Sequence, residues 1–152
     1  MQIKVMEKDQ AVAVCQMIEV CFLEFVAPDY SLEGVQEFFV YANAKSLQER
    51  SEDNHFVLVT ADHNRIAAAL EMRKPNHISL LFVDKSYQQE GIAKKLLVRA
   101  VEICKAETPS ITEITVNASP YALRIYEKMG FTVVAPQNTI NGISFIKMKL
   151  LL

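Results

Sequence analysis

The segment from Ile78 to Cys104 constrains the fold of this chain more than any other part of its sequence. Residues 78–83 (ISLLFV) form a mostly apolar run with the length of a buried strand. A polar turn follows, and apolar residues then recur at the spacing of one helical face. These residues are Ala93, Leu96, Leu97, Ala100, Val101 and Cys104. The pattern predicts a strand, a turn and an amphipathic helix that begins at Gly91.

The start of this predicted helix is suited to an anion. The first amides of a helix have no acceptor within the helix, and they lie at the positive end of its dipole. Gly91 has no Cβ and Ala93 has only a methyl group, so a phosphate group has room to approach the main chain. An ordinary strand-to-helix turn explains the same residues equally well. The P-loop motif G-x-x-x-x-G-K-[ST] and the dinucleotide motif G-x-G-x-x-G are both missing.

A second block of sequence, residues 114–131, repeats the order of strand and helix. Residues 114–116 predict a short strand, and Ser119 followed by Pro120 is typical of a helix start, with a hydroxyl cap and a proline at the first helical position. The helix is expected to run through Tyr126 and to stop at Gly130. Tyr126 lies on the face that should turn inward, so a purely structural aromatic residue is one interpretation of it.

Together the two blocks resemble the GNAT acetyltransferase superfamily. Its acetyl-coenzyme A signature, Q/R-x-x-G-x-G/A, corresponds to residues 88–93 (QQEGIA), and its following motif, N-x-x-A-x-x-x-Y-x-K-x-G-F, to residues 119–131 (SPYALRIYEKMGF). Two positions depart from the family pattern. Ser119 replaces the usual asparagine, which alters one hydrogen bond to the cofactor arm. Glu90 stands where a basic residue is common, and its charge should weaken pyrophosphate binding slightly.

The resemblance implies a fold and a cofactor. We expect a single domain over residues 1–152, of α/β (α+β) class. It should have a mixed central sheet of about seven strands, splayed at its centre and flanked by about four helices. Acetyl-CoA is the implied co-substrate, with residues 82–83 on its pantetheine arm and residues 88–94 on its pyrophosphate. The implied cofactor-binding residues are Phe82, Val83, Gln88, Gln89, Gly91, Ile92, Ala93, Lys94, Asn117, Ser119 and Tyr126.

Three basic residues in or near the two motifs are candidates to bind the adenosine phosphate. Lys94, Lys95 and Arg124 each have a suitable charge, but each is equally well explained as a solvated helix residue. The splay of the central strands implies unpaired main-chain groups, and the amides of pantetheine can pair with those groups like an extra strand.

The resemblance also implies a reaction, the transfer of an acetyl group to a primary amine by direct attack in a ternary complex. Tyr126 holds the family position of the proton donor to the leaving thiolate, and a main-chain amide near Val83 would polarise the carbonyl. A protonated amine needs a base, for which Glu71 is the first candidate and His77 the second. No metal is implied, since His55, His63 and His77 lack metal-ligand spacing.

The first half of the chain should wall the acceptor site. Helices are expected over residues 10–25 and 31–41, a polar helix remnant and loop over 45–54, and a hairpin from strands 55–60 and 65–72. Val12, Cys15, Ile18, Phe22 and Phe25 are predicted to form the buried stripe of the first helix. The aromatic residues expected near the acceptor are Phe22, Phe25, Tyr30, Phe38, Phe39 and Tyr41, and the acidic ones are Asp29, Glu33 and Glu71. The acceptor is predicted to be a small-molecule or peptide amine, which leaves a polyamine, an amino acid, an antibiotic and a protein terminus open.

The two ends of the chain complete the predicted sheet. A first strand is expected over residues 2–5, and two last strands over 132–135 and 143–150, with Asn141-Gly142 supplying the turn between them.

Composition excludes several other classes. The net charge is −2 with no long basic run, which argues against a nucleic-acid partner or an anionic membrane. No apolar run approaches the ~20 residues of a membrane span, and the N-terminus does not resemble a signal peptide. Cys15, Cys21 and Cys104 form an odd set without C-x-x-C spacing, so reduced core thiols and a cytoplasmic location are expected.

Two other functions are alternatives for this chain. The sequence does not decide between a monomer and a homodimer. A non-catalytic acyl-CoA-binding module would keep the fold with a structural Tyr126. A toxin that acetylates aminoacyl-tRNA would favour a basic surface, which this chain lacks.

Overall fold

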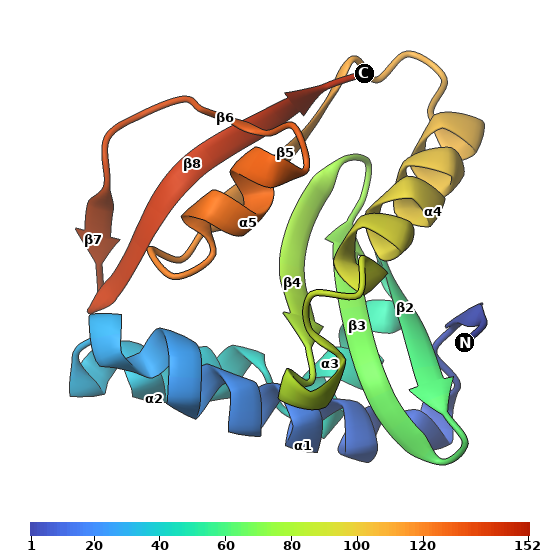
Figure 1. Cartoon of the computed structure of the whole chain (residues 1–152), viewed down its shortest axis with the longest axis horizontal. Helices are drawn as coiled ribbons and strands as arrows, with labels where there is room; N and C mark the ends of the chain where they lie inside the picture. Colours follow the sequence, from blue (N-terminus) through green and yellow to red (C-terminus); the bar gives the residue numbers. More distant parts are fainter.

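The computed structural model describes residues 1–152, and an eight-stranded sheet forms its centre (Figure 1). The strands are β1 (Ile3–Val5), β2 (His55–Asp62), β3 (Arg65–Arg73), β4 (His77–Val83), β5 (Glu113–Ala118), β6 (Thr132–Val133), β7 (Asn138–Ile140) and β8 (Ile143–Leu151). Their order across the sheet is β1-β2-β3-β4-β5-β8-β6, with β7 paired to β8 outside this path. Only β4 and β5 run parallel.

Five α-helices cover the two faces of the sheet. They are α1 (Ala11–Cys21), α2 (Leu32–Tyr41), α3 (Ala44–Ser51), α4 (Ile92–Glu107) and α5 (Leu123–Lys128). The predicted mixed α/β architecture is confirmed. The additions are β7, in a stretch predicted as loop, and α3, which is a true helix because Asn43 caps it with a hydrogen bond from the amide of Ser46 (3.0 Å).

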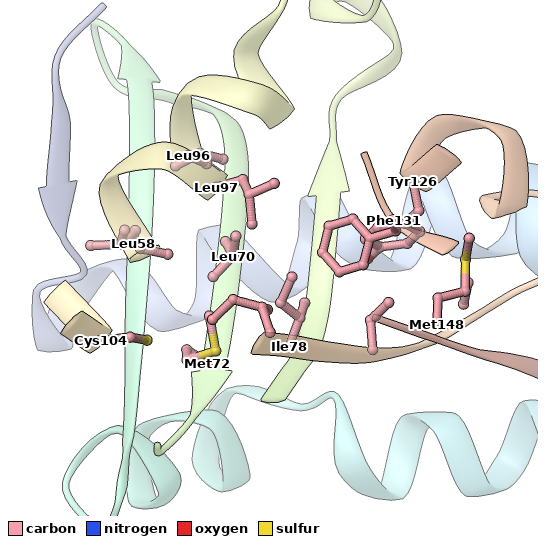
Figure 2. Packing of buried hydrophobic residues seen from close by; sticks show 14 of the residues in the cluster. Leu58, Leu70, Met72, Ile78, Leu96, Leu97, Cys104, Tyr126, Phe131 and Met148 are labelled. Atoms are coloured by element: carbon pink, nitrogen blue, oxygen red, sulfur yellow. The ribbon is translucent and has the colours of Figure 1, made fainter. Parts of the chain in front are cut away.

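Two hydrophobic clusters lie on opposite faces of the sheet. One contains side chains of α4 and α5 together with alternate residues of the strands, and Figure 2 shows it reaching from Leu96 and Leu97 at one side to Tyr126, Phe131 and Met148 at the other. The other joins α1 and α3 to the opposite face of β2, β3 and β4. The predicted apolar stripe of α4 is confirmed at four of its positions, Leu96, Leu97, Ala100 and Cys104, which are all buried.

The predicted stripe of the first helical segment is confirmed at Ile18 and Phe22, which are buried, but not at Val12. Val12 is 57% exposed, whereas Ala11, Val14, Ile18 and Cys21 are buried against β3 and β4. A regular helical repeat that starts one residue earlier, at Ala11, gives this face. Residues 22–26 then form a wider π-helical turn, which rotates the following side chains relative to an ideal helix.

The expectation that no segment resembles a membrane span needs a correction. The continuous helical segment Lys8–Asp29 is long and apolar enough to cross a membrane by length and composition. Its inward face packs on the sheet, as the core helix of a soluble domain does, and a single such helix is weak evidence for a membrane. The compartment of the protein stays a prediction.

The central strands β4 and β5 diverge. They pair only at His77 with Thr115 and at Ile78 with Val116. On its other side, β4 pairs with β3 along its whole length, but the register shifts at Ser79, which has no partner between Ile78 and Leu80. Such a bulge bends the strand. Residues 79–83 therefore turn away from β5 and leave one edge of their main chain without a partner strand.

Helix α2 joins the two halves of the sheet at the open end of this gap. The amide of Ser31 donates to the carbonyl of Gly142 (3.1 Å), in the turn between β7 and β8. A Cβ on Gly34 would lie 2.1 Å from the same carbonyl oxygen, so this approach requires glycine. Asn141 and Gly142 both have positive φ, which confirms the predicted Asn-Gly turn, although it connects β7 to β8.

The helix that carries Tyr126 begins later than predicted. Residues 119–122 form a turn in which the amide of Ala122 donates to the hydroxyl of Ser119 (3.2 Å), and α5 starts only at Leu123. The turn at Ser119 and Pro120 comes before the helix because β5 ends directly ahead of it, at Ala118. Gly130, with φ at +102°, follows the last turn as expected.

Candidate active site

A cavity of about 590 Å³ opens between the diverging strands β4 and β5. Five consecutive β4 residues, Ser79 to Val83, line one wall, and Val116 and Asn117 of β5 line the other. The free main-chain edge of β4 faces this gap, and buried amides and carbonyls without a partner strand favour a ligand that can pair with them. An extended, amide-containing chain fits such an edge.

The cavity reaches the first turn of α4. Gly91, just before Ile92, has φ at +77°, a left-handed conformation that favours glycine. A Cβ built on Gly91 would have no atom within 4 Å, so the space above the first helical turn is open. The free amides of this turn and the ammonium group of Lys94 could together hold an anion at this end of the cavity.

Side chains hold the loop between β4 and α4 in place. The amide nitrogen Nε2 of Gln88 donates to the carbonyl of Val83 (3.0 Å), which ties the loop back to the strand. The hydroxyl of Tyr87 donates to Asp62 (2.8 Å), and Arg65 pairs with Asp84 (3.1 Å). Side-chain contacts therefore fix the loop that leads to the first turn of α4.

All eleven residues that the sequence assigns to the cofactor line this one cavity, from Phe82 on β4 to Tyr126 on α5. The structure brings together residues that lie up to 44 positions apart. Of the cations weighed for the adenosine phosphate, Lys94 lines the cavity, whereas Lys95 lies beside it in a shallower hollow with Arg99. Arg124 lines neither.

Tyr126 combines a buried ring with access to the cavity. The residue is 5% exposed, and its ring packs edge-to-face on Phe131 with centroids 5.2 Å apart. Burial raises the pKa of the Tyr126 phenol above its ordinary value. The hydroxyl therefore stays protonated near neutral pH, and it can donate a proton or a hydrogen bond but cannot act as a base.

Glu71 does not reach the cavity, which corrects its prediction as a catalytic base. Its side chain is 1% exposed and faces α3, where Arg50 donates to it from Nε (2.7 Å) and Nη2 (3.0 Å). His55 Nδ1 lies 2.9 Å from the same carboxylate without the alignment of a hydrogen bond. Because both carboxylate oxygens are held by Arg50, Glu71 is a structural ion-pair partner.

His77, the second candidate base, also lies outside the cavity. Its Nδ1 is 2.8 Å from the hydroxyl of Thr115 on β5, at the point where the two central strands still pair. Burial, with a smaller effect of Arg73, lowers the pKa of His77 to about 4. The imidazole is therefore neutral at neutral pH, but His77 is not among the residues that line the cavity.

The far end of the cavity is aromatic. Of the six aromatic residues that the sequence offered, Phe25, Tyr30 and Phe38 line it. Phe22 stacks on Phe38 and Phe39 packs against both, whereas the Tyr41 ring lies under the Arg50 guanidinium group. Neither Asp29 nor Glu33 lines it.

Sequence reasoning assigned no role in the site to several lining residues, among them Lys128, Cys21 and Tyr121. The Cys21 thiol donates to the carbonyl of Val83 (3.4 Å), and the Tyr121 ring stacks on Phe25 with centroids 5.0 Å apart. Cys21 had a sequence signal, because it lies one helical turn from Ile18 and Phe25 on the inward side of the first helix. Tyr121 had none, since it occupies a variable position of the second motif.

A family model for the acetyltransferase (GNAT) domain matches residues 26–152, so this chain belongs to the GNAT acetyltransferase family. Among curated proteins, a UPF0039 protein of Schizosaccharomyces pombe is 27% identical over 99 residues. That match covers 63% of this chain and 66% of the relative, just under two thirds of its length.

Solved structures share the fold over nearly the whole chain. A GCN5-related N-acetyltransferase of Rhodopseudomonas palustris has a TM-score of 0.79 at 19% identity, covering 99% of this chain and 95% of its own. The PaiA N-acetyltransferase of Thermoplasma acidophilum, in complex with coenzyme A, has a TM-score of 0.78 at 19% identity and covers 100% of both chains. An aminoglycoside 6′-N-acetyltransferase complexed with coenzyme A has a TM-score of 0.73 at 11% identity, covering 99% of this chain and 97% of its own.

Proposed function

We propose that this protein is an acetyl-CoA-dependent N-acetyltransferase that transfers the acetyl group to a primary amine by direct attack in a ternary complex. Family membership supports acetyl transfer from acetyl-CoA as the general reaction. The observation that carries the finer proposal is the cavity, which joins a free strand edge, an open helix start at Gly91 and the hydroxyl of Tyr126.

The chain's own groups account for binding. The unpaired edge of β4 at residues 79–83 pairs with the amides of the pantetheine arm, and the first turn of α4 receives the pyrophosphate. Lys94 and Lys128, which both line the cavity, add positive charge for the phosphates. Binding at these two points holds the thioester between the strands, where a main-chain amide near Val83 polarises its carbonyl.

The proposed reaction needs one proton donor, the hydroxyl of Tyr126. The amine nitrogen forms a bond to the carbonyl carbon, the carbon–sulfur bond breaks, and the thiolate takes the proton of the Tyr126 hydroxyl. The proton released by the amine then restores the phenol through water in the cavity. Burial raises the pKa of Tyr126, so the tyrosine enters the reaction protonated.

A route through an acetylated cysteine is less well supported. Cys21 is the only cysteine that lines the cavity, and burial raises the pKa of its thiol to about 11. A protonated thiol is a poor nucleophile. Direct attack by the amine needs no such intermediate.

Amine-dependent thiol release tests the proposal. Acetyl-CoA should bind in calorimetry, and release of free coenzyme A should rise with the concentration of an added primary amine. Tight binding of acetyl-CoA with no release for any amine would instead favour the non-catalytic acyl-CoA-binding module.

A further inference from the structure

The lining of the cavity carries no negative charge at any point. Its charged residues are two lysines, Lys94 and Lys128, and it contains no aspartate, glutamate or histidine. The remaining titratable lining groups are phenols and one thiol. Burial raises the pKa of Cys21, Tyr30 and Tyr121, so these groups are uncharged near neutral pH.

Three carboxylates near the cavity are already paired. Glu24 binds Lys85 (2.9 Å) and Asp84 binds Arg65 (3.1 Å), both outside the lining. Glu71, the only buried acid, is held by Arg50. These three carboxylates are therefore not free to receive a cationic group on the acceptor, and Asp29, the neighbour of Tyr30, is exposed and does not line the cavity.

The acceptor end is instead built from aromatic rings that already pack on other rings. Phe38 stacks on Phe22 with centroids 3.7 Å apart, and Phe25 stacks on Tyr121. The ammonium group of Lys85 lies 6.0 Å from the Phe25 ring, so a cation already contacts that ring from another element. A cage that binds a cation presents ring faces to it, and these rings offer mainly apolar surface.

The reacting nitrogen and the rest of the acceptor have different needs. The nitrogen must be neutral to attack, so it requires no carboxylate in the bound state. Any second ammonium group of the same molecule would remain charged, and leaving a charge unpaired among apolar groups is costly.

We infer that the acceptor is a monoamine with an apolar, aromatic or aliphatic body, and that this cavity excludes polyamines and other polycations. The inference rests on the proposed acetyl transfer and narrows its substrate class. Asp29, Glu33 and Glu71, the acidic residues that the sequence placed near the acceptor, are all missing from the lining.

Two amines of nearly equal shape provide the test. Hexylamine and 1,5-diaminopentane differ by a terminal methyl group against a terminal ammonium group. With saturating acetyl-CoA, kcat/KM for hexylamine should exceed that for 1,5-diaminopentane by about 100-fold. We also expect 2-phenylethylamine to be accepted better than spermidine. Equal values, or a preference for the diamine, would overturn the inference.

A charge introduced at Tyr30 sharpens the test. Tyr30 lines the acceptor end, half-buried, with its ring edge against Phe22 (5.4 Å between centroids). Tyr30→Glu and Tyr30→Gln remove the same ring and differ only in charge. The ratio of hexylamine to diamine activity should be about tenfold smaller in the Glu variant than in the Gln variant. The same ratio in both variants would contradict a preference set by the missing carboxylate.

Failure of acetyl transfer is distinguishable from failure of this inference. If no amine releases coenzyme A although acetyl-CoA binds, the proposed function is wrong. The dissociation constants of the two amines for the protein–coenzyme A complex then show whether the acceptor site prefers an apolar monoamine or a diamine. Tighter binding of hexylamine supports an apolar acceptor site. Tighter or equal binding of the diamine, or no binding of either amine, overturns it.

Discussion

Gly91, in the loop that follows β4, and Glu71, on the adjacent strand β3, have opposite surroundings. At Gly91 the structure is open, with no atom within 4 Å of an added Cβ. At Glu71 it is closed, with Arg50 holding both carboxylate oxygens. The first position has empty space beside polar main-chain groups, whereas the second has a polar side chain with every partner supplied from within the protein.

This difference separates a binding site from a structural ion pair. Buried polar groups seek partners, and a group left without an internal partner is available to a ligand. A charged side chain beside an active-site strand is a structural group when a helix brings its counter-ion, as α3 does with Arg50. Burial or nearness to a cavity therefore does not identify a catalytic acid. The internal counter-ion of the carboxylate has to be checked as well.

The largest expected effect is at Gly91. Gly91→Val should abolish acetyl-CoA binding, measured by calorimetry, because the side chain would occupy the space for the pyrophosphate. The positive φ adds about 1–2 kcal/mol of strain, which should leave the protein folded in a urea titration. Gly130→Ala is a matched control, since Gly130 also has positive φ but does not line the cavity. Undiminished affinity in a folded Val variant would refute the phosphate site.

The next effect concerns Tyr126. Tyr126→Phe keeps the ring contact with Phe131 and removes only the hydroxyl, so acetyl-CoA should bind as before. We expect kcat to fall roughly 10²–10⁴-fold if the phenol is the proton donor, measured where chemistry limits the rate. Phe131→Leu is a control that disturbs the packing but keeps the hydroxyl. An unchanged kcat in Tyr126→Phe would make Tyr126 a purely structural aromatic residue.

The ion pair of Glu71 should affect stability rather than turnover. Removing one partner of a buried pair leaves the other charge uncompensated, so Glu71→Gln and Arg50→Gln should each lower the free energy of unfolding by about 3 kcal/mol. The double variant should recover about 1–2 kcal/mol of that loss in a double-mutant cycle. For folded Glu71→Gln, kcat should change less than about twofold. A lower kcat with a weaker rise against pH would restore Glu71 as a base.

The smallest expected effect is the pH dependence at His77. Burial lowers the pKa of folded His77 to about 4, below its ordinary value of 6.5, so the unfolded chain binds the extra proton between these values. Stability should therefore fall as the pH drops from about 6.5 to 4. The loss should be about 2 kcal/mol or less, because the side chain is only partly buried. His77→Gln should flatten this slope in denaturant titrations, and an unchanged slope in this variant would contradict the prediction.

The residues on the cofactor side of the cavity were predictable from local sequence patterns. The apolar run at residues 78–83, Gly91 and the helical stripe after it are local signals, because a strand, a left-handed residue and an amphipathic helix each depend on near neighbours in the chain. The two GNAT motifs added Asn117, Ser119 and Tyr126, which no single pattern could have assigned to the same cavity. The structure places all of them around it.

The acceptor side depended on contacts between distant elements. The pairing of Glu71 with Arg50 joins β3 to α3, and the stack of Phe25 on Tyr121 joins the two halves of the molecule across the gap. The β-bulge at Ser79 and the close approach of Gly34 to Gly142 likewise depend on neighbours in space. Periodicity shows which face of a helix is apolar, but it does not show which side chain lies opposite. For that reason the sequence brought the predicted cofactor residues to one cavity, whereas the partner of the buried Glu71 emerged only from the tertiary structure.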